Sequence, residues 1–401
     1  MQPTVTLMAN SGRHQARLPE ALAREGVLRQ AVRLAPALEI LEPDAAGGLR
    51  AVRRFPGQQT GSRILWATWR RLPLGWRGAV PFSGWARVAD WRIARHLAAC
   101  DVFHGLMGVS FASLDRAKRA GAVTLIDNPT LHPAAFRRAV LADQAEAGVG
   151  PGEGEPVMGL SAIRMCARQY EACDRIIVYS SAAARSFEPY RYGGKVVVVR
   201  PGVDHGLFAP AAARRRAGGF RVGYVGRIEA AKGVHHLIAA WKRLALADGE
   251  LVLAGRVLPE MAGLRAAGVT LAGILPVEGV VRLLQDCDLF VFPSVNEGLP
   301  LAVLEAMSCG VPVLACLGTG AEDCVTSGRE GLLAPGKDTE ALAEAMQWCC
   351  GHREELGAMG RAARRRVEGE FTLGHYVGRL VELYRCVATD FISRPGRTSI
   401  V

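Results

Sequence analysis

Two carboxylates eight residues apart are the feature of this chain whose spacing most directly indicates chemistry. Glu297 and Glu305 lie in PSVNEGLPLAVLEAMSCGVPV, residues 293–313. The apolar run 289–292 before this segment predicts a buried parallel strand, and a helix is expected from about Leu301. The turn between them leads into a helix N-terminus, whose free N–H groups suit a phosphate. Acids beside an anion site are expected to bind hydroxyl groups. The alternative is a surface loop and an exposed helix face that carry Glu by chance.

A second segment, GYVGRIEAAKGVHHLI at residues 223–238, predicts a strand, a turn and a helix start. Gly226 and Arg227 end the strand, and Lys232 precedes the helix. The two cations and the nearby N–H groups would point at one place, as a diphosphate leaving group requires when charge builds on its oxygens. Exposed basic residues on an ordinary loop are the alternative.

Together these segments resemble motifs of a known family. The first resembles the E-x7-E motif of retaining glycosyltransferases with the GT-B fold, of the family-4 (glycosyl transferases group 1) type. The resemblance implies that Glu297 lies beside the transferred sugar and that Glu305 binds the ribose of the nucleotide. The second resembles the family's G-R-x4-K-G element, which assigns Arg227 and Lys232 to the donor diphosphate.

The resemblance also implies further contacts with the substrates. Donor diphosphate contacts are assigned to Gly226, Gly298 and Leu299, nucleobase-side contacts to Gly273, Ile274 and Leu275, and an acceptor or phosphate loop to Ser11 and Gly12. The segment 318–322, Gly-Thr-Gly-Ala-Glu, stands where the family usually closes the donor pocket with Gly-Gly and an acid.

Three residues at strand ends of the first half are candidates for contact with the transferred sugar. The family often has a His at this depth, so the catalytic candidates besides Glu297 are His132 first and Asp127 second. His104, also at a strand end, is the competitor. A lone His is often structural, so the structural role stays open for each histidine.

Asp286-Cys287-Asp288 fits the D-x-D pattern that binds Mn²⁺ or Mg²⁺ in another glycosyltransferase architecture. Here it falls between an expected helix and the strand 289–292, so Asp286 should end the helix and Asp288 should begin the strand. We therefore expect no metal and no cofactor, with Arg227, Lys232 and helix termini taking the metal's place.

The bulk composition indicates a well-cored globular protein of 401 residues, for which two domains are the better estimate. No apolar run is long enough to span a membrane, and the N-terminus does not fit a signal peptide. The ten cysteines form no C-x-x-C pair, which favours thiols in a reducing cytoplasm over a zinc site or disulfides.

The formal charge of +11 is concentrated in the first part of the chain. Residues 1–150 hold 20 Lys and Arg against 11 Asp and Glu, and the Arg50–Arg95 region has ten Arg and five of the seven Trp. Arg beside Trp suits an anionic membrane surface or a polyanionic acceptor. Half-buried Trp covered by Arg stems is the alternative. Surfaces of Arg and aromatic side chains also bind single-stranded nucleic acid, but no other feature of the sequence supports that partner.

Alternating strand and helix patterns predict doubly wound α/β domains. The resemblance implies the GT-B fold, with two Rossmann-like doubly wound parallel-sheet domains facing a cleft. Strands are expected at 5–8, 102–104, 123–127, 176–179, 196–200, 220–225, 251–254 and 289–292. The resemblance implies an N-terminal acceptor-side domain at 1–203, a nucleotide-sugar domain at 204–370, and 371–401 as a tail whose helix 373–389 crosses back to the first domain. The Gly-rich loop 148–156 would be an acceptor-side lid.

The function that the resemblance implies is transfer of a hexose from a nucleotide diphosphate sugar to a hydroxyl acceptor, with retention at the anomeric carbon. Bacterial polysaccharide or glycolipid biosynthesis at the inner face of the cell membrane is the expected setting. Inactive transferase-like binding to glycan or membrane is the alternative of another class. A phosphorylase would need a cofactor-bound lysine, and after Lys242 the only lysine is Lys337. A dinucleotide oxidoreductase would need a Gly-rich fingerprint that both first strands lack.

Overall fold

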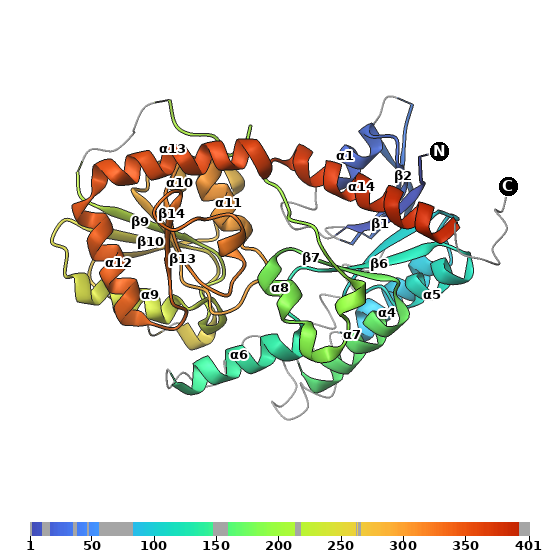
Figure 1. Ribbon diagram of the computed structural model, residues 1–401, viewed down its shortest axis with the longest axis horizontal. Helices are drawn as coiled ribbons and strands as arrows, with labels where there is room; N and C mark the ends of the chain where they lie inside the picture. Colours follow the sequence, from blue (N-terminus) through green and yellow to red (C-terminus); the bar gives the residue numbers. More distant parts are fainter. Residues whose placement is uncertain are drawn as a thin grey trace.

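The structure of the protein, a computed structural model, describes residues 2–9, 17–34, 38–45, 48–55, 83–146, 159–212, 218–261, 263 and 266–392. Two α/β domains, each built on one predominantly or wholly parallel sheet, lie side by side (Figure 1). This confirms the predicted fold class. Strands β12 and β13 of the second domain are buried along their whole length, as expected for strands covered by helices on both faces.

The first domain contains an eight-stranded sheet with the order β4-β3-β2-β1-β5-β6-β7-β8. The strands β2, β3 and β4 pair antiparallel at one edge, and all the other pairs are parallel. The strands are β1 (Val5–Ala9), β2 (Leu28–Arg33), β3 (Glu39–Pro43), β4 (Leu49–Arg54), β5 (Val102–Leu106), β6 (Val123–Asn128), β7 (Arg175–Val178) and β8 (Val196–Val198). The helices are α1 (Leu18–Arg24), α4 (Ser83–Ala94), α5 (Ala112–Arg119), α6 (Pro133–Glu146), α7 (Leu160–Ala172) and α8 (Ser181–Arg185), with 3-10 turns η1 (Glu188–Tyr190) and η2 (Gly193–Lys195).

The second domain contains a six-stranded parallel sheet with the order β11-β10-β9-β12-β13-β14. Its strands are β9 (Arg221–Val225), β10 (Glu250–Ala254), β11 (Val269–Gly273), β12 (Leu289–Phe292), β13 (Val313–Cys316) and β14 (Gly331–Ala334). Its helices are α9 (Val234–Leu244), α10 (Val277–Gln285), α11 (Leu301–Ser308), α12 (Thr339–Gly351) and α13 (Arg353–Glu370), with η3 (Ala230–Lys232), η4 (Pro259–Met261) and η5 (Ala321–Asp323).

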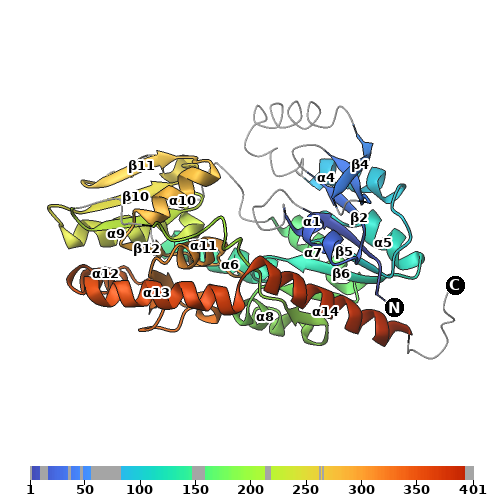
Figure 2. The same cartoon turned by 90° about the horizontal axis from the view of Figure 1, so that it is seen from above.

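The last helix, α14 (Leu373–Ile392), returns to the first domain (Figure 2). The chain passes between the domains twice, at Val203 and at residues 371–373, and these two segments are hydrogen-bonded to each other. Val203 N–H donates to Phe371 O at 2.8 Å, and Leu373 N–H donates to Val203 O at 2.9 Å. Gly202 is needed at this crossing. A Cβ there would lie 2.6 Å from the carbonyl carbon of Thr372.

A buried polar network fixes α14 on the first sheet. The hydroxyl of Tyr384 on α14 lies 2.7 Å from His104 Nδ1 on β5. On the neighbouring strand β6, Asp127 Oδ2 accepts a hydrogen bond at 2.7 Å from the hydroxyl of Tyr179, which directly follows β7 and also interacts with Tyr376 of α14. All five residues are buried, and burial lowers the pKa of His104 to about 4. His104 lies in the middle of β5 and not at its end as expected, whereas Asp127 lies near the end of β6, and these contacts account for both polar residues.

The predicted strands all exist, with ends that differ by one or two residues. The predicted domain boundary at 203/204 falls between β8, which ends at Val198, and β9, which begins at Arg221. The antiparallel strands β3 and β4 were not predicted from the sequence. The candidate residues Ser11 and Gly12, the Gly-rich loop 148–156 and most of the Arg/Trp region lie outside the described residues.

Candidate functional site

The contact at the centre of the site joins Lys232 and Glu297. The Lys232 ammonium group donates to Glu297 Oε1, and the two side chains are only 17% and 16% exposed. Lys232 ends η3, and Glu297 lies in the turn between β12 and α11. The two residues are 65 positions apart in the chain. The structure therefore brings together the two motifs that the sequence analysis singled out separately.

Close packing of the backbone makes this contact possible. Gly233, between η3 and α9, has φ 63°, and a Cβ there would lie 2.9 Å from the carbonyl carbon of Pro293. Ser294 adds a hydrogen bond from its hydroxyl to Ala231 O at 3.3 Å. The start of α9 thus lies directly against the end of β12, and only glycine allows this approach.

Arg227 lies at the same edge of the second sheet. Its guanidinium group pairs with Glu229 at 2.9 Å, and its side chain is 43% exposed. The hydroxyl of Tyr224 donates to Arg227 O at 2.7 Å. Burial raises the pKa of Tyr224 well above its usual value, and the charges of Glu229 and Glu297 add to the effect. Glu229, which is buried, was missed by sequence reasoning, because a single Glu in a loop carries no motif.

The turn after Glu297 touches the first domain. A Cβ on Gly298 would lie 2.7 Å from the carbonyl carbon of Pro129, in the loop after β6. Gly298 O accepts a hydrogen bond from the hydroxyl of Ser180, which also caps α8 by accepting from Ala183 N–H at 3.1 Å. The Glu297–Gly298 turn therefore lies at the contact between the two domains.

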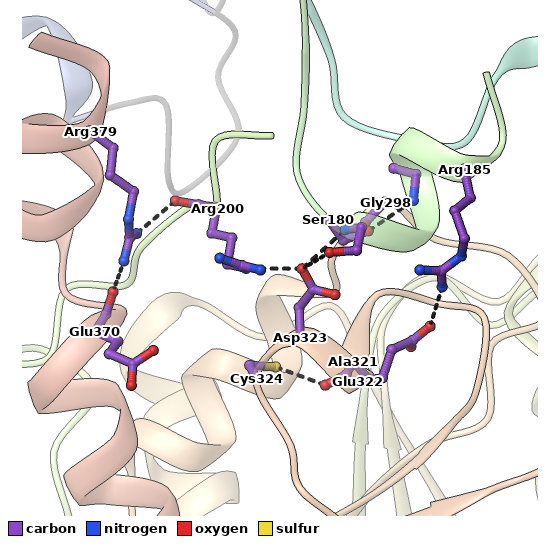
Figure 3. Close-up of polar contacts among 12 residues, drawn as sticks. Ser180, Arg185, Arg200, Gly298, Ala321, Glu322, Asp323, Cys324, Glu370 and Arg379 are labelled. Carbon is purple, nitrogen blue, oxygen red and sulfur yellow. Dashed lines mark hydrogen bonds and ion pairs between the residues drawn. The ribbon is translucent and has the colours of Figure 1, made fainter. Parts of the chain in front are cut away.

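Charged groups next to this turn continue the contact between the domains (Figure 3). Asp323 of η5 accepts hydrogen bonds from Ser181 N–H at 3.0 Å, Ser181 Oγ at 3.1 Å and Arg200 Nε at 2.9 Å. Arg185 pairs with Glu322 at 3.5 Å, and Arg379 of α14 donates to Arg200 O at 3.0 Å. Glu322 belongs to the 318–322 segment that was expected to close the donor pocket, so this segment contacts the first domain.

The helix α11 begins next to this contact and carries the second acid of the motif. Pro300 is its N-cap residue, and no side chain of the described residues caps it. Its first N–H groups are therefore suited to an anionic group. Leu299 is buried, and Glu305 is 3% exposed in the interior of the helix. The ribose role of Glu305 stays a prediction.

The three candidates on the nucleobase side differ in exposure. Gly273 ends β11 with φ 67°, and its carbonyl accepts from Gly255 N–H at 2.7 Å. Ile274 is 76% exposed, which is unusual for a large apolar side chain, whereas Leu275 packs partly against the core. An exposed apolar side chain at the C-terminal end of a parallel strand is suited to covering a planar ring.

The histidine and aspartate candidates of the first domain lie in packed surroundings. The His132 ring stacks on Tyr190 with 3.6 Å between centroids and meets Phe187 edge-on at 4.9 Å. Burial lowers the pKa of His132 to about 4, so its ring is neutral. Asp127 lies in the network under α14. These environments account for both residues structurally, and their catalytic roles stay predictions.

The D-x-D pattern has the structural role that the sequence indicated. Asp286 is the C-cap residue of α10, and Asp288 directly precedes β12. Arg221 holds both, since its N–H donates to Asp288 Oδ2 at 2.8 Å and its guanidinium group lies 3.8 Å from Asp286 Oδ2.

The described helices include none that is both long and apolar enough to cross a membrane. All ten cysteines are free thiols. Burial raises the pKa of Cys309 and Cys316 to about 12, so they are not reactive thiolates at neutral pH.

The fold is that of the GT-B glycosyltransferases, with two parallel-sheet α/β domains. Residues 219–352 match the family model described as glycosyl transferases group 1. Sucrose-phosphate synthase from Thermosynechococcus elongatus superposes with a TM-score of 0.69 at 19% identity, covering 96% of this chain and 99% of that one. The Anabaena HepE structure in complex with UDP-glucose superposes with a TM-score of 0.65 at 17% identity, covering 96% and 100%. At these identities the likeness shows the fold alone.

A curated relative matches at higher identity over part of its length. The chain is 32% identical over 251 residues to the alpha-maltose-1-phosphate synthase of Mycolicibacterium smegmatis, covering 54% of this chain and 64% of that protein. The chain spans less than two thirds of the length of this relative and of two further curated relatives. With the family model, these matches support a GT-B glycosyltransferase.

Proposed function

We propose that this protein transfers a hexose from a nucleotide diphosphate sugar to a hydroxyl acceptor with retention at the anomeric carbon, in bacterial polysaccharide or glycolipid biosynthesis. The observation that carries the proposal is the contact of Lys232 with Glu297 beside Arg227 and the start of α11. Cations and N–H groups at one place suit a diphosphate, and an adjacent carboxylate suits a sugar hydroxyl.

The proposed chemistry uses the protein's own charges in place of a metal or cofactor. As the glycosidic bond breaks, Arg227 and Lys232 stabilise the negative charge that develops on the departing diphosphate. Glu297 binds the sugar, and Glu305 binds the ribose. Contact between the domains at Gly298 excludes water and brings the acceptor hydroxyl to the anomeric carbon.

The donor site is tested first by thermal melting with UDP, GDP, ADP and UDP-glucose, each with and without EDTA. UDP-glucose is included because the structural neighbour HepE binds it. A ligand at about a hundred times its dissociation constant adds about 2.7 kcal/mol of stability, which a melt resolves clearly. We expect one nucleotide class to raise the melting temperature independently of EDTA, and Glu305→Ala to abolish the increase. No increase with any nucleotide would favour an inactive binding protein.

Retention is tested separately on the product. Once the melt has identified a donor, proton NMR of the reaction product gives the anomeric configuration of the new bond. The same configuration as the donor supports the proposal, whereas inversion would overturn this part of it. Activity that disappears with EDTA and returns with Mg²⁺ would overturn metal-independent transfer.

The proposed setting is the anionic inner surface of the cell membrane. Helix α4 exposes Val88 at 56% and Trp91 at 49%, and the guanidinium carbon of Arg95 lies 3.5 Å from the Trp91 ring centroid. Asp90, on the buried side, accepts from Phe111 N–H at 2.6 Å and anchors α4 to the start of α5. An exposed apolar and cationic helix face suits lipid headgroups.

Flotation with phosphatidylglycerol vesicles tests this setting. We expect the chain to float with anionic but not with phosphatidylcholine vesicles, and Trp91→Ala to weaken flotation. Leu141→Ala, which also removes an exposed apolar side chain (38% exposed) but on α6, is the control. Equal flotation of both variants, or none by the unmodified chain, would contradict membrane binding through α4.

A further inference from the structure

A second polar cluster lies between the domains, where α6 of the first domain meets the beginning of α9 of the second. Helix α6 of the first domain extends under the second domain toward α9 (Figure 1). Asn296 donates from its side-chain amide to Phe136 O at 3.0 Å near the start of α6, and Lys337 pairs with Glu146 at 3.9 Å at its end. Asp143 on α6 lies between these two contacts along the helix and faces the beginning of α9.

Three potential metal ligands meet at this place. Asp143 is 1% exposed, His236 Nε2 lies 3.0 Å from its Oδ1, and His235 Nε2 lies 3.4 Å from its Oδ2. Ligand atoms of the three residues all lie within 4.8 Å of one another. The His235 side chain is 10% exposed, and among the described residues neither of its ring nitrogens has a hydrogen-bond partner. Buried ring nitrogens without a hydrogen-bond partner need an explanation, because unsatisfied buried polar groups are costly.

The spacing of these groups fits a tetrahedral metal. Zinc binds imidazole nitrogen at about 2.0–2.1 Å, so two ligand atoms of a tetrahedral site lie about 3.3 Å apart. His235 Nε2 lies 3.4 Å from Asp143 Oδ2 and His236 Nε2 lies 3.0 Å from Asp143 Oδ1, so each imidazole is already at about this distance from one oxygen of the carboxylate. Small adjustments of the side chains would complete the geometry.

A further residue positions one of the ligands. His236 Nδ1 lies 2.9 Å from Thr339 Oγ1, at the start of α12. When Nδ1–H donates to this hydroxyl, the lone pair of Nε2 points toward Asp143, which is the arrangement that metal-binding histidines use.

We propose that Asp143, His235 and His236 form a binding site for one divalent transition-metal ion, zinc foremost, that joins the two domains. Two imidazoles and one carboxylate are suited to zinc, and three protein ligands leave a fourth position for water. The ion binds deprotonated imidazole nitrogens and a carboxylate, so any proton on these ligand atoms leaves to solvent when it binds. Because the ligands come from α6 and α9, the bound ion holds the domains in their present arrangement. This site is separate from the proposed donor site, and it does not depend on the proposed function.

The full-length chain, freed of metal with a chelator and dialysed, is titrated with Zn²⁺ against a chromophoric competitor and, separately, with Co²⁺. Cobalt reports its ligands through visible absorption, a readout that a merely structural hydrogen bond does not produce. The variants are Asp143→Asn, His235→Gln and His236→Gln, chosen to keep size and hydrogen bonding. His205→Ala, at an exposed histidine between the domains, is the matched control. Thr339→Val tests the positioning contact.

We expect one Zn²⁺ per chain, a cobalt spectrum of nitrogen and oxygen ligands, and a rise in melting temperature with Zn²⁺. The three ligand variants should bind at least about tenfold more weakly, Thr339→Val should weaken binding less, and His205→Ala should bind normally. A chain that binds no zinc overturns the proposal. So does zinc binding that all three ligand variants retain, or a cobalt spectrum with thiolate bands, since these place the ion on cysteines.

Discussion

Gly298→Ala tests whether contact between the domains depends on the absence of a side chain at this position. The added Cβ would lie 2.7 Å from the carbonyl carbon of Pro129 and 3.1 Å from Thr130 N, and closer still to the Pro129 oxygen. Ordinary contacts begin at about 3.4 Å, so the loops must separate by roughly 0.7 Å or more. The nearest atoms belong to the other domain, so the substitution acts on domain contact and leaves the fold of each domain intact.

The magnitude follows from the cost of overpacking. Inserting a methyl group into a close-packed place costs about 1–3 kcal/mol, which lowers the closed population relative to the open one by about 5-fold to 150-fold. Gly378→Ala is the matched control, because a Cβ on Gly378 meets nothing within 4 Å.

Small-angle X-ray scattering of the free chain measures the effect. We expect a larger radius of gyration for Gly298→Ala than for Gly378→Ala, with sugar transfer slowed in proportion once a donor is known. Superimposable scattering curves with equal transfer rates would refute the reasoning that this glycine permits closure.

Further perturbations separate binding, chemistry and stability. Lys232→Ala should slow transfer by about 100-fold or more with little change in nucleotide affinity, whereas Glu305→Ala should weaken nucleotide binding. Calorimetry measures the nucleotide affinity and steady-state kinetics the transfer rate. Full activity in both variants would contradict the proposed site. Because burial lowers the pKa of His104 to about 4, the unfolded chain binds a proton more readily than the folded one as the pH falls below about 6.5. Stability should therefore decline from pH 6.5 to pH 4, by up to about 1.4 kcal/mol per pH unit for this residue. The free energy of unfolding of His104→Gln, measured by urea unfolding, should depend less steeply on pH than that of the unmodified chain. Asp323→Ala leaves the Ser181 N–H without its acceptor and should cost about 1–3 kcal/mol, seen as a lower melting temperature; an unchanged melt would show that water replaces the contact.

The strands and the central site could be predicted because their signals are local. Apolar runs such as 289–292 are continuous, since parallel strands are buried on both faces. The Lys232 and Glu297 motifs each follow a strand of the second sheet, and β9 and β12 are neighbours in that sheet. The carboxyl ends of adjacent parallel strands meet at one edge, so two separate motifs had to converge there.

Other parts of the site had no local signal. His132 lies in the loop between β6 and α6, where a catalytic residue could stand, but the aromatic rings around it come from α7, η1 and the segments next to them. The antiparallel strands β3 and β4 carry no distinct pattern in a segment rich in arginine. The Asp143–His236 contact joins residues 93 positions apart on two domains.

The sequence by itself determined the doubly wound architecture and the placement of Arg227, Lys232 and Glu297 next to strands of one sheet, whereas their donor-side roles stay predictions. The architecture depends on periodicity and the placement on groups near strand ends, which the chain encodes within short segments. Only the tertiary structure decided how the domains meet, through Gly298 against Pro129, Asp323 on Ser181 and the cluster around Asp143. Such contacts form between surfaces that are distant in sequence, and their distances depend on the packing of both whole domains.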